Sequence, residues 1–125
     1  MSNVLILGFT GDFTINFVHY AAYYNYIIEP RYKGGEEELY KFLRNNIIYP
    51  KKALRKGIEG TVIISVYITD KGLNGGGVKQ KFGKSLLDDE ALRVINLTTN
   101  WIPGMVDGEP YNFTLNIPVR FTIEN

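Results

Sequence analysis

The stretch YNFTLNIPVRFTI, from Tyr111 to Ile123, decides the fold. Its odd positions are all apolar, and its even positions are polar or proline. Successive side chains of a β-strand point to opposite faces, so this alternation predicts one long strand with its odd face on a core and its even face toward water. Pro118 lies on the even side and has no N–H to give to a neighbouring strand. Because such a gap is tolerated at the edge of a sheet, we expect the strand to lie at or near an edge.

An edge strand suggests a mode of binding. Its outer row of N–H and C=O groups has no partner within the sheet, so an extended peptide can add itself there as a further strand. The pattern of the last stretch therefore directs attention to binding by strand addition.

Composition narrows the classes of function. The chain has 125 residues, of which 45% are hydrophobic, and a net charge of +1. A chain of this length makes one domain that buries roughly two-thirds of its unfolded surface. Nucleic-acid binding usually requires a basic face, and no Lys/Arg cluster stands out here, so we expect no nucleic-acid partner. Cysteine is absent, which excludes disulfides and thiolate metal sites.

Catalytic chemistry finds few candidate residues. His19 is the only histidine, so nucleophilic triads and histidine-based metal sites lack parts. The acidic runs Glu36–Glu38 and Asp88–Glu90 each stand where a helix is expected to start, and the helix dipole favours carboxylates at that end. We therefore predict that the protein is not an enzyme and has no catalytic residue, metal site or cofactor.

Two helices are predicted after Gly35. The first starts with the acidic run, and its apolar stripe at helical spacing consists of Leu39, Phe42, Leu43 and Ile47. Tyr49-Pro50 ends this helix, because the residue before a proline is disfavoured in the helical conformation. Lys51 to Lys56 is then long enough for about two further turns before Gly57 stops them.

A hairpin and a third helix are predicted next. Gly60 opens a strand that runs to Thr69 and places on one face Val62, Ile64, Val66 and Ile68. Asp70-Lys71-Gly72 is a turn signal, so we expect the chain to reverse into a second strand around Gly77 to Phe82. Ser85 and Asp88 have capping-box spacing, which predicts a helix that ends at about Thr99.

The first 29 residues have a different character. The β-like runs Val4–Phe9 and Phe13–Val18 flank Thr10-Gly11-Asp12, a pattern compatible with a hairpin. Tyr20–Ile28 is neutral and rich in aromatic residues. We expect this segment to pack or pair, either against the rest of the chain or against another copy.

Several short features follow one another in a specific order. They are Tyr49-Pro50, Ile58-Glu59-Gly60 ahead of a strand, Asp70-Lys71-Gly72, Trp101-Ile102-Pro103-Gly104 and the alternating last strand. Together they resemble the C-terminal domain of TonB. Gly34-Gly35 resembles the Gly-Gly variety of that family, although Lys33 stands where a proline is usual. The resemblance covers about Pro30 to Asn125, so we predict a TonB C-terminal-like domain over residues 30–125 and a separate segment over residues 1–29.

The resemblance implies a fold and a partner. The fold is α+β in two layers, with two helices packed on a small antiparallel sheet that has a long C-terminal edge strand. In the family this domain lies in the periplasm of Gram-negative bacteria and binds the TonB box, a short peptide of an outer-membrane transporter. Relatives add the box to the last strand, with the Tyr-Pro region nearby. Carried over, this nominates as partner-binding residues Tyr49, Pro50, Asn112, Thr114, Asn116 and Arg120.

Two hypotheses of function follow. In the family the domain transmits work drawn from the proton gradient of the inner membrane, but these 125 residues contain no anchor helix and no Pro-rich arm. The chain would reach the inner-membrane motor proteins only through such an anchor, so it is either a fragment of a longer transducer or a free-standing relative. The alternative function is a self-associating interaction module that forms a homodimer through its edge. Tyr49-Pro50 also has a plainer interpretation as a helix break, and Trp101 as a core anchor.

Overall fold

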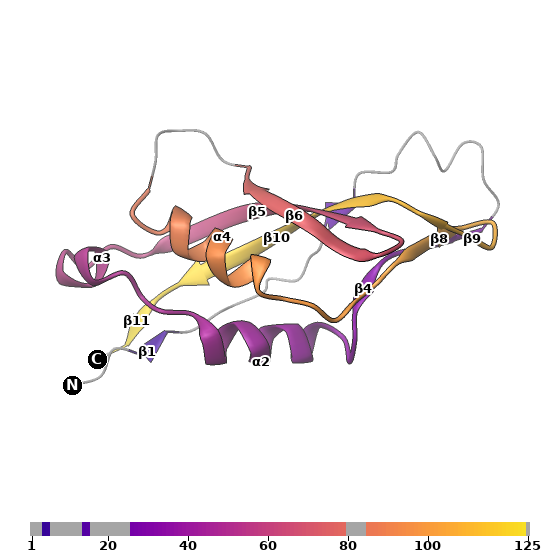
Figure 1. Cartoon of the computed structure of the whole chain (residues 1–125). Helices are drawn as coiled ribbons and strands as arrows, with labels where there is room; N and C mark the ends of the chain where they lie inside the picture. Colours follow the sequence, from indigo (N-terminus) through magenta and orange to yellow (C-terminus); the bar gives the residue numbers. More distant parts are fainter. Residues whose placement is uncertain (1–3, 6–13, 16–25, 80–84, 125) are drawn as a thin grey trace.

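The computed structural model describes residues 4–5, 14–15, 26–79 and 85–124. Within them, α2 and α4 cover one face of an antiparallel sheet, and α3 lies at one end of it (Figure 1). This is the two-layer α+β arrangement that the sequence predicts, so the fold class is confirmed. The C-terminal strands lie close to the first described residues of the chain.

The central sheet has the strand order β2-β10-β5-β6. Its centre consists of β5 (Gly60–Thr69) and β10 (Phe113–Phe121), which pair antiparallel along the whole length of β10. β6 (Gly72–Val78) lies beside β5. The short β2 (Thr14–Ile15) lies beside β10 and pairs with it at only two positions.

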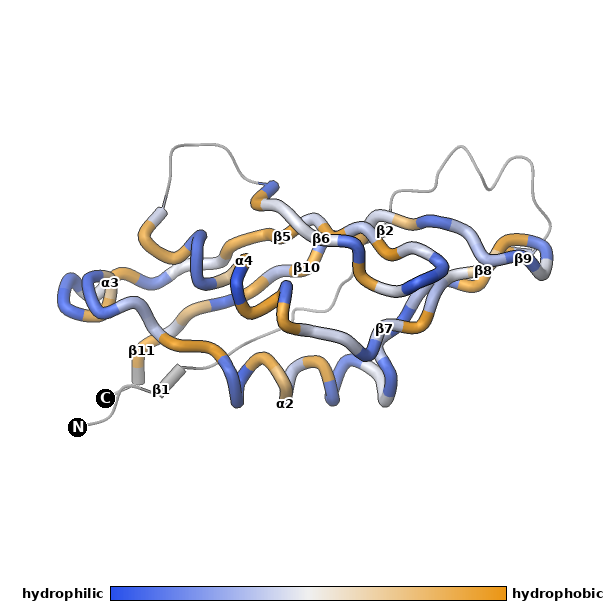
Figure 2. Tube along the Cα trace, in the orientation of Figure 1, coloured by the Kyte–Doolittle hydropathy of each residue, from blue (hydrophilic) through white to orange (hydrophobic). Residues whose placement is uncertain are grey.

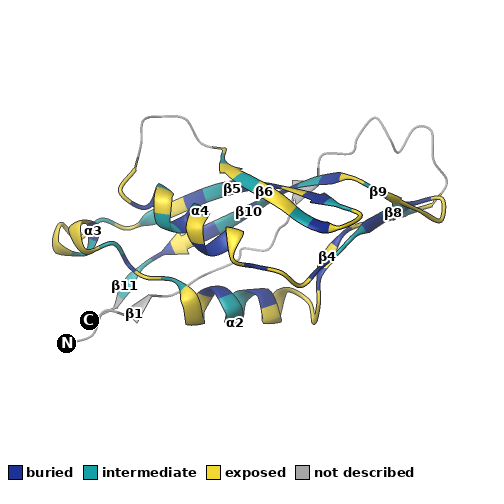
Figure 3. Cartoon of the chain, viewed as in Figure 1, coloured by how far each residue is buried: buried dark blue, intermediate teal, exposed yellow. Residues whose placement is uncertain are grey.

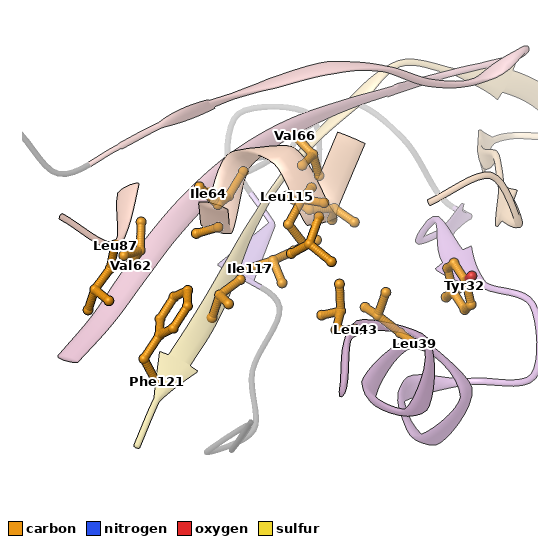
Figure 4. Packing of buried hydrophobic residues seen from close by; sticks show 14 of the residues in the cluster. Tyr32, Leu39, Leu43, Val62, Ile64, Val66, Leu87, Leu115, Ile117 and Phe121 are labelled. Carbon is orange, nitrogen blue, oxygen red and sulfur yellow. The ribbon is translucent and has the colours of Figure 1, made fainter. Parts of the chain in front are cut away.

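The core forms between this sheet and the helices. In β5 and β10 the buried residues alternate with less buried ones, as expected for strands with one face on a core (Figure 3). From β10 the core receives Phe113, Leu115, Ile117, Val119 and Phe121. The helices contribute mainly Leu39, Leu43, Ala53, Ala91, Val94 and Ile95. Apolar segments of the sheet and helices face one another in Figure 2, and Figure 4 shows Leu39 and Leu43 pointing toward Leu115 and Ile117.

The helices start where the sequence predicts. α2 (Glu36–Asn46) and α4 (Asp88–Asn96) have three acidic residues each in their first turn, and α3 (Lys51–Arg55) follows Pro50. The predicted cap of α4 is also present, since the Ser85 N–H donates to the Asp88 carboxylate at 3.1 Å.

The end of α4 differs from the prediction. The helix ends at Asn96 rather than at about Thr99. The N–H of Leu97 donates to the carbonyl of Val94, and the N–H of Thr98 donates to the carbonyl of Ile95. These bonds tighten the last turn, and the Thr98 hydroxyl donates to the Ile95 carbonyl as well, so the α-helical ladder stops there.

β6 begins earlier than predicted. The two-residue turn at Asp70-Lys71 places Gly72 directly opposite Thr69, so pairing starts at once rather than around Gly77. Three glycines, Gly75 to Gly77, lie inside the strand, next to a register shift at which three steps along β6 match two steps along β5. Glycine carries no side chain, so the usual alternating signal of a strand is missing from this stretch. The predicted end of the strand, Phe82, lies outside the described residues.

The single strand predicted over residues 111–123 is divided into three. β9 (Glu109–Tyr111) and β10 are separated at Asn112, and β10 and β11 (Ile123–Glu124) are separated at Thr122. β9 forms a hairpin with β8 (Gly104–Val106) through Asp107-Gly108. A strand of three residues is too short to give a periodic signal, so the sequence pattern predicted neither β8 nor β9 as a separate strand.

Short pairings form two further small sheets beside the central one. β3 (Ile27–Ile28) pairs with β8, and β4 (Arg31–Tyr32) pairs with β7 (Trp101–Ile102). Trp101 is buried, as expected for a core anchor; its indole N–H donates to the Thr98 hydroxyl at 2.7 Å.

The described residues of the N-terminal runs pair with the C-terminal strands. β1 (Val4–Leu5) pairs with β11, and β2 pairs with β10. The turn expected at Thr10-Gly11-Asp12 lies outside the described residues, as do Tyr20 to Asn25.

We predict that Gly104→Ala strongly destabilises the fold. A Cβ at this position would lie 2.4 Å from the Phe113 ring and 2.8 Å from Pro30, so the β3-β8 region would have to move. Overpacking of this kind costs about 1–3 kcal/mol or more of unfolding free energy, measurable by urea denaturation. Gly77→Ala is the matched control, because its Cβ meets nothing within 4 Å, and it should leave stability within about 0.5 kcal/mol of the wild type. Equal losses in the two variants would contradict this account.

Candidate functional site

The candidate site is the outer edge of β10, and one hydrogen bond fixes its orientation. The Lys79 N–H donates to the Ile63 carbonyl at 2.8 Å, so the backbone groups of Ile63 face β6. Pro118 stands directly opposite Ile63 in the β5-β10 ladder. In an antiparallel pair, opposite residues either bond each other or both point away, so the backbone of Pro118 faces away from β5.

The backbone groups of successive residues along β10 point alternately away from β5 and toward it. The backbone groups of Thr114, Asn116 and Arg120 face outward with those of Pro118, while those of the odd residues face β5. The outer edge therefore offers N–H and C=O groups at Thr114, Asn116 and Arg120 but only a carbonyl at Pro118. The predicted location of Pro118 on an edge agrees with this geometry.

Occupation of this edge is partial. In the described part of the chain, β10 pairs on its outer side only at Leu115 and Asn116, opposite β2. β11 pairs in the same manner with β1. Since β5 holds β10 along its whole length on the inner side, the edge is a rigid template with a short covered stretch.

The nominated side chains on β10 form a line rather than a cluster. Thr114 and Asn116 are half-buried and Arg120 is exposed, so the even face is less open to water than the sequence predicts. Asn112 is exposed and donates to the Tyr67 hydroxyl at 3.1 Å. Asn112 and Arg120 are eight residues apart, which at roughly 3.4 Å per residue separates them by about 27 Å.

Tyr49 lies inside the protein. Its side chain is 8% exposed, its hydroxyl donates to the Ile58 carbonyl at 2.5 Å, and its ring meets the Phe121 ring edge-on at 5.6 Å. Burial raises the pKa of Tyr49 above the ordinary 10.0, and the charge of Glu59 raises it further. Tyr49 thus supports the end of β10 from the core side.

Pro50 and its loop are held by a small charged network that the sequence analysis did not identify. The Glu90 carboxylate accepts the Ile48 N–H at 2.6 Å and is bound by the Arg93 guanidinium at 2.7 Å. Arg93 also donates to the Asn46 carbonyl at 2.9 Å, and hydrogen bonding to Glu90 raises its pKa. The signal in the sequence is the i,i+3 spacing of Glu90 and Arg93, whereas the sequence analysis assigned Glu90 only to the acidic start of a helix.

The nominated residues approach the edge from opposite faces of the sheet. Tyr49 packs on Phe121, an odd residue of β10, and so lies on the helix-covered face. Thr114, Asn116 and Arg120 have even numbers and point to the other face. The two groups therefore do not form one cluster, and the connection between them is β10 itself, through Phe121.

The raised pKa values of the two buried tyrosines have a structural cause. Burial raises the pKa of Tyr32, as it does that of Tyr49, and both phenols lie in the core. Among the described residues, no group of three or more His, Cys, Asp or Glu side chains is placed to hold a metal ion.

The sequence of this chain is similar to known proteins. The family model for the Gram-negative bacterial TonB protein C-terminal matches residues 45–123, more than half of the chain. The chain belongs to this TonB C-terminal family. It is also 34% identical over 80 residues to the Protein TonB of Vibrio cholerae serotype O1. That alignment covers 61% of this chain and 31% of the relative, so the chain spans less than a third of the relative's length. No solved structure matches the chain.

The family match confirms the resemblance inferred from the motifs. It includes the motifs from Tyr49-Pro50 to the last strand and ends at Ile123. In the TonB C-terminal domain described here, no helix among the described residues is long and apolar enough to cross a membrane.

We predict that Tyr49→Phe lowers the free energy of unfolding by about 1 kcal/mol near pH 7, because the bond to the Ile58 carbonyl is lost. The raised pKa of Tyr49 means that the unfolded chain loses this proton first as pH rises. Stability from Tyr49 is therefore complete below pH 10 and is lost above it. Urea titrations between pH 7 and pH 11 should show that the difference in unfolding free energy between wild type and Tyr49→Phe becomes smaller as pH rises above 10.

Tyr26→Phe provides the control, since it removes a phenol that is 64% exposed, and it should match the wild type near pH 7. If the difference in unfolding free energy between wild type and Tyr49→Phe became larger above pH 10, Tyr49 would not be a buried phenol with a raised pKa.

We predict that Glu90→Gln loosens the Tyr49-Pro50 loop. The amide keeps one acceptor but loses the charge and the two-point contact with Arg93. Loss of unfolding free energy should be about 1–2 kcal/mol, and amide chemical shifts should change at Ile48. Glu109→Gln, on an exposed position of β9, is the control and should change neither quantity. Unchanged shifts at Ile48 in Glu90→Gln would overturn the role given to the network.

Proposed function

We propose that this TonB C-terminal domain binds the TonB box of an outer-membrane transporter by adding it as a strand to the outer edge of β10. The observation that carries the proposal is the row of outward backbone groups at Thr114, Asn116 and Arg120, held rigid by β5 and only partly covered. Main-chain bonds give such a complex its affinity, and alternate side chains give it specificity. No cofactor or metal takes part.

Each nominated residue then has a role set by its position. Thr114, Asn116 and Arg120 flank the added strand on the face away from the helices. Asn112 marks the end of β10 next to the β8-β9 hairpin. Tyr49 supports the end of β10 from the core side through Phe121, and Pro50 follows it directly before α3.

The wider function is the coupling of the inner-membrane proton gradient to uptake across the outer membrane, with the domain in the periplasm. The family membership and the likeness to the Protein TonB of Vibrio cholerae support this proposal.

A second candidate function is self-association. The pairing of β1 and β2 with the C-terminal strands favours it, because both are short strands from a distant part of the chain that add to this edge. A homodimer in which two copies pair at this edge would use the same backbone groups.

We predict that synthetic peptides from the N-termini of outer-membrane transporter plugs shift the amide signals of Thr114, Asn116 and Arg120 in the labelled chain. Peptides N-methylated at alternate residues provide a matched pair. In the first peptide, the methyl groups replace the N–H hydrogens that would face β10. This peptide should bind at least tenfold more weakly, since each net hydrogen bond contributes about 0.5–1.5 kcal/mol. In the second peptide, the methylated nitrogens face away from β10, and it should bind like the unmodified peptide.

Sedimentation of the same samples separates the two functions. A monomer that shows no shifts with any peptide would contradict the transporter proposal. A dimer whose edge amides are protected without peptide would instead support self-association.

A further inference from the structure

We propose that β1 and β2 act as built-in occupants of the outer edge of β10 and β11, and that a peptide strand is added there only when they leave. This inference deepens the proposed function, on which it rests for the identity of the incoming peptide. The strand that competes with the incoming peptide is an extended segment of the same chain.

The first observation is the common direction and order of the two short strands. Leu5 stands opposite Ile123, and Ile15 stands opposite Leu115, both in antiparallel pairing. Leu5 and Ile15 are ten positions apart, whereas Leu115 and Ile123 are eight positions apart, so the registers of the two pairings differ by two residues. Both strands nevertheless run antiparallel to the C-terminal strands, and the earlier one lies opposite the later position, as expected when one segment of chain supplies both pairings.

The second observation is that the built-in strands use the groups that an added strand needs. Thr14 stands opposite Asn116, whose backbone faces outward. Val4 stands opposite Glu124. The N–H of the preceding residue, Ile123, donates to the Glu59 carboxylate at 2.7 Å on the inner side, so the groups of Glu124 face outward too.

The third observation is the weak attachment of these strands compared with the main sheet. β1 and β2 are two residues long and pair at two positions each, whereas β5 pairs with every residue of β10. Between the two pairings lies Pro118, which has no N–H to offer on that side. Short pairings separated by such a gap can open while the β5-β10 ladder stays closed.

Occupation of the edge would lower the apparent affinity for any added strand. When the binding-competent state has a fractional population f, the apparent dissociation constant is the intrinsic constant divided by f. An edge that is free one-tenth of the time would thus bind a peptide about ten times more weakly than an open edge. Peptides with a low intrinsic affinity for the edge would therefore not displace the N-terminal strands.

The test removes the N–H groups of the built-in strands that face the edge and keeps the full chain. In Val4→Pro/Thr14→Pro, both residues that stand opposite outward groups lose their donors. The matched control, Val4→Thr/Thr14→Val, changes the same positions but keeps the donors and a strong preference for strands. Neither variant alters a residue of β10.

Three readouts are compared between the proline variant, the control and the wild type. Hydrogen exchange at the Asn116 amide should be at least tenfold faster in the proline variant. A synthetic peptide that copies residues 2–18 of this chain should bind the proline variant at least tenfold more tightly than the wild type. Transporter-plug peptides should gain affinity by a similar factor. The control should match the wild type in all three.

The outcomes separate this inference from the proposed function. Unchanged exchange at Asn116 together with unchanged binding of the 2–18 peptide would overturn the inference. Gains with the 2–18 peptide but no binding of plug peptides to any form would support the inference and contradict the transporter function. A wild-type dimer that becomes a monomer in the proline variant would mean that the strands are exchanged between copies, which overturns their assignment as occupants within one chain.

Discussion

The β5-β10 ladder is the constraint on which the rest of the structure depends. It pairs every residue of β10 with β5 and thereby fixes which side chains enter the core and which backbone groups face outward. The odd residues of β10 pack against α2 and α4, and Leu39 and Leu43 reach them from α2 (Figure 4). A shift of this register by one residue would turn the apolar face to the solvent, so burial and edge orientation are set together.

This coupling bears on the binding proposed for a short row of residues. Thr114, Asn116 and Arg120 are spread along one strand and form no cluster. What they share is a backbone whose position is determined by nearly all of the core. Glu90 and Arg93 likewise connect the loop before Pro50 to α4 through Ile48 and Asn46. The position of the edge therefore depends on elements that lie away from it.

Much of the fold could be predicted from the sequence because its longest elements have clear periods. The alternation in Tyr111 to Ile123, the acidic helix starts and the Ser85 cap all correspond to observed features. Predictions were wrong where the local signal was absent, as for β6, whose glycines show no alternation, and for the two- and three-residue strands around Gly104. The nominated site residues came from the family resemblance. The inward position of Tyr49 and the network of Glu90 depend on tertiary contacts that no spacing in the sequence reveals.

Pro118 also bears on how this domain behaves in a crowded compartment. A straight edge that accepts one foreign strand also accepts the edge of another copy, and repeated pairing of that kind leads to aggregates. A proline in the middle of the outward row interrupts the regular ladder that two such edges would build. A second copy that paired along the whole edge would therefore lack one ladder bond at Pro118, as would any other added strand. Pro118 thus limits how regular a ladder can grow outward from β10.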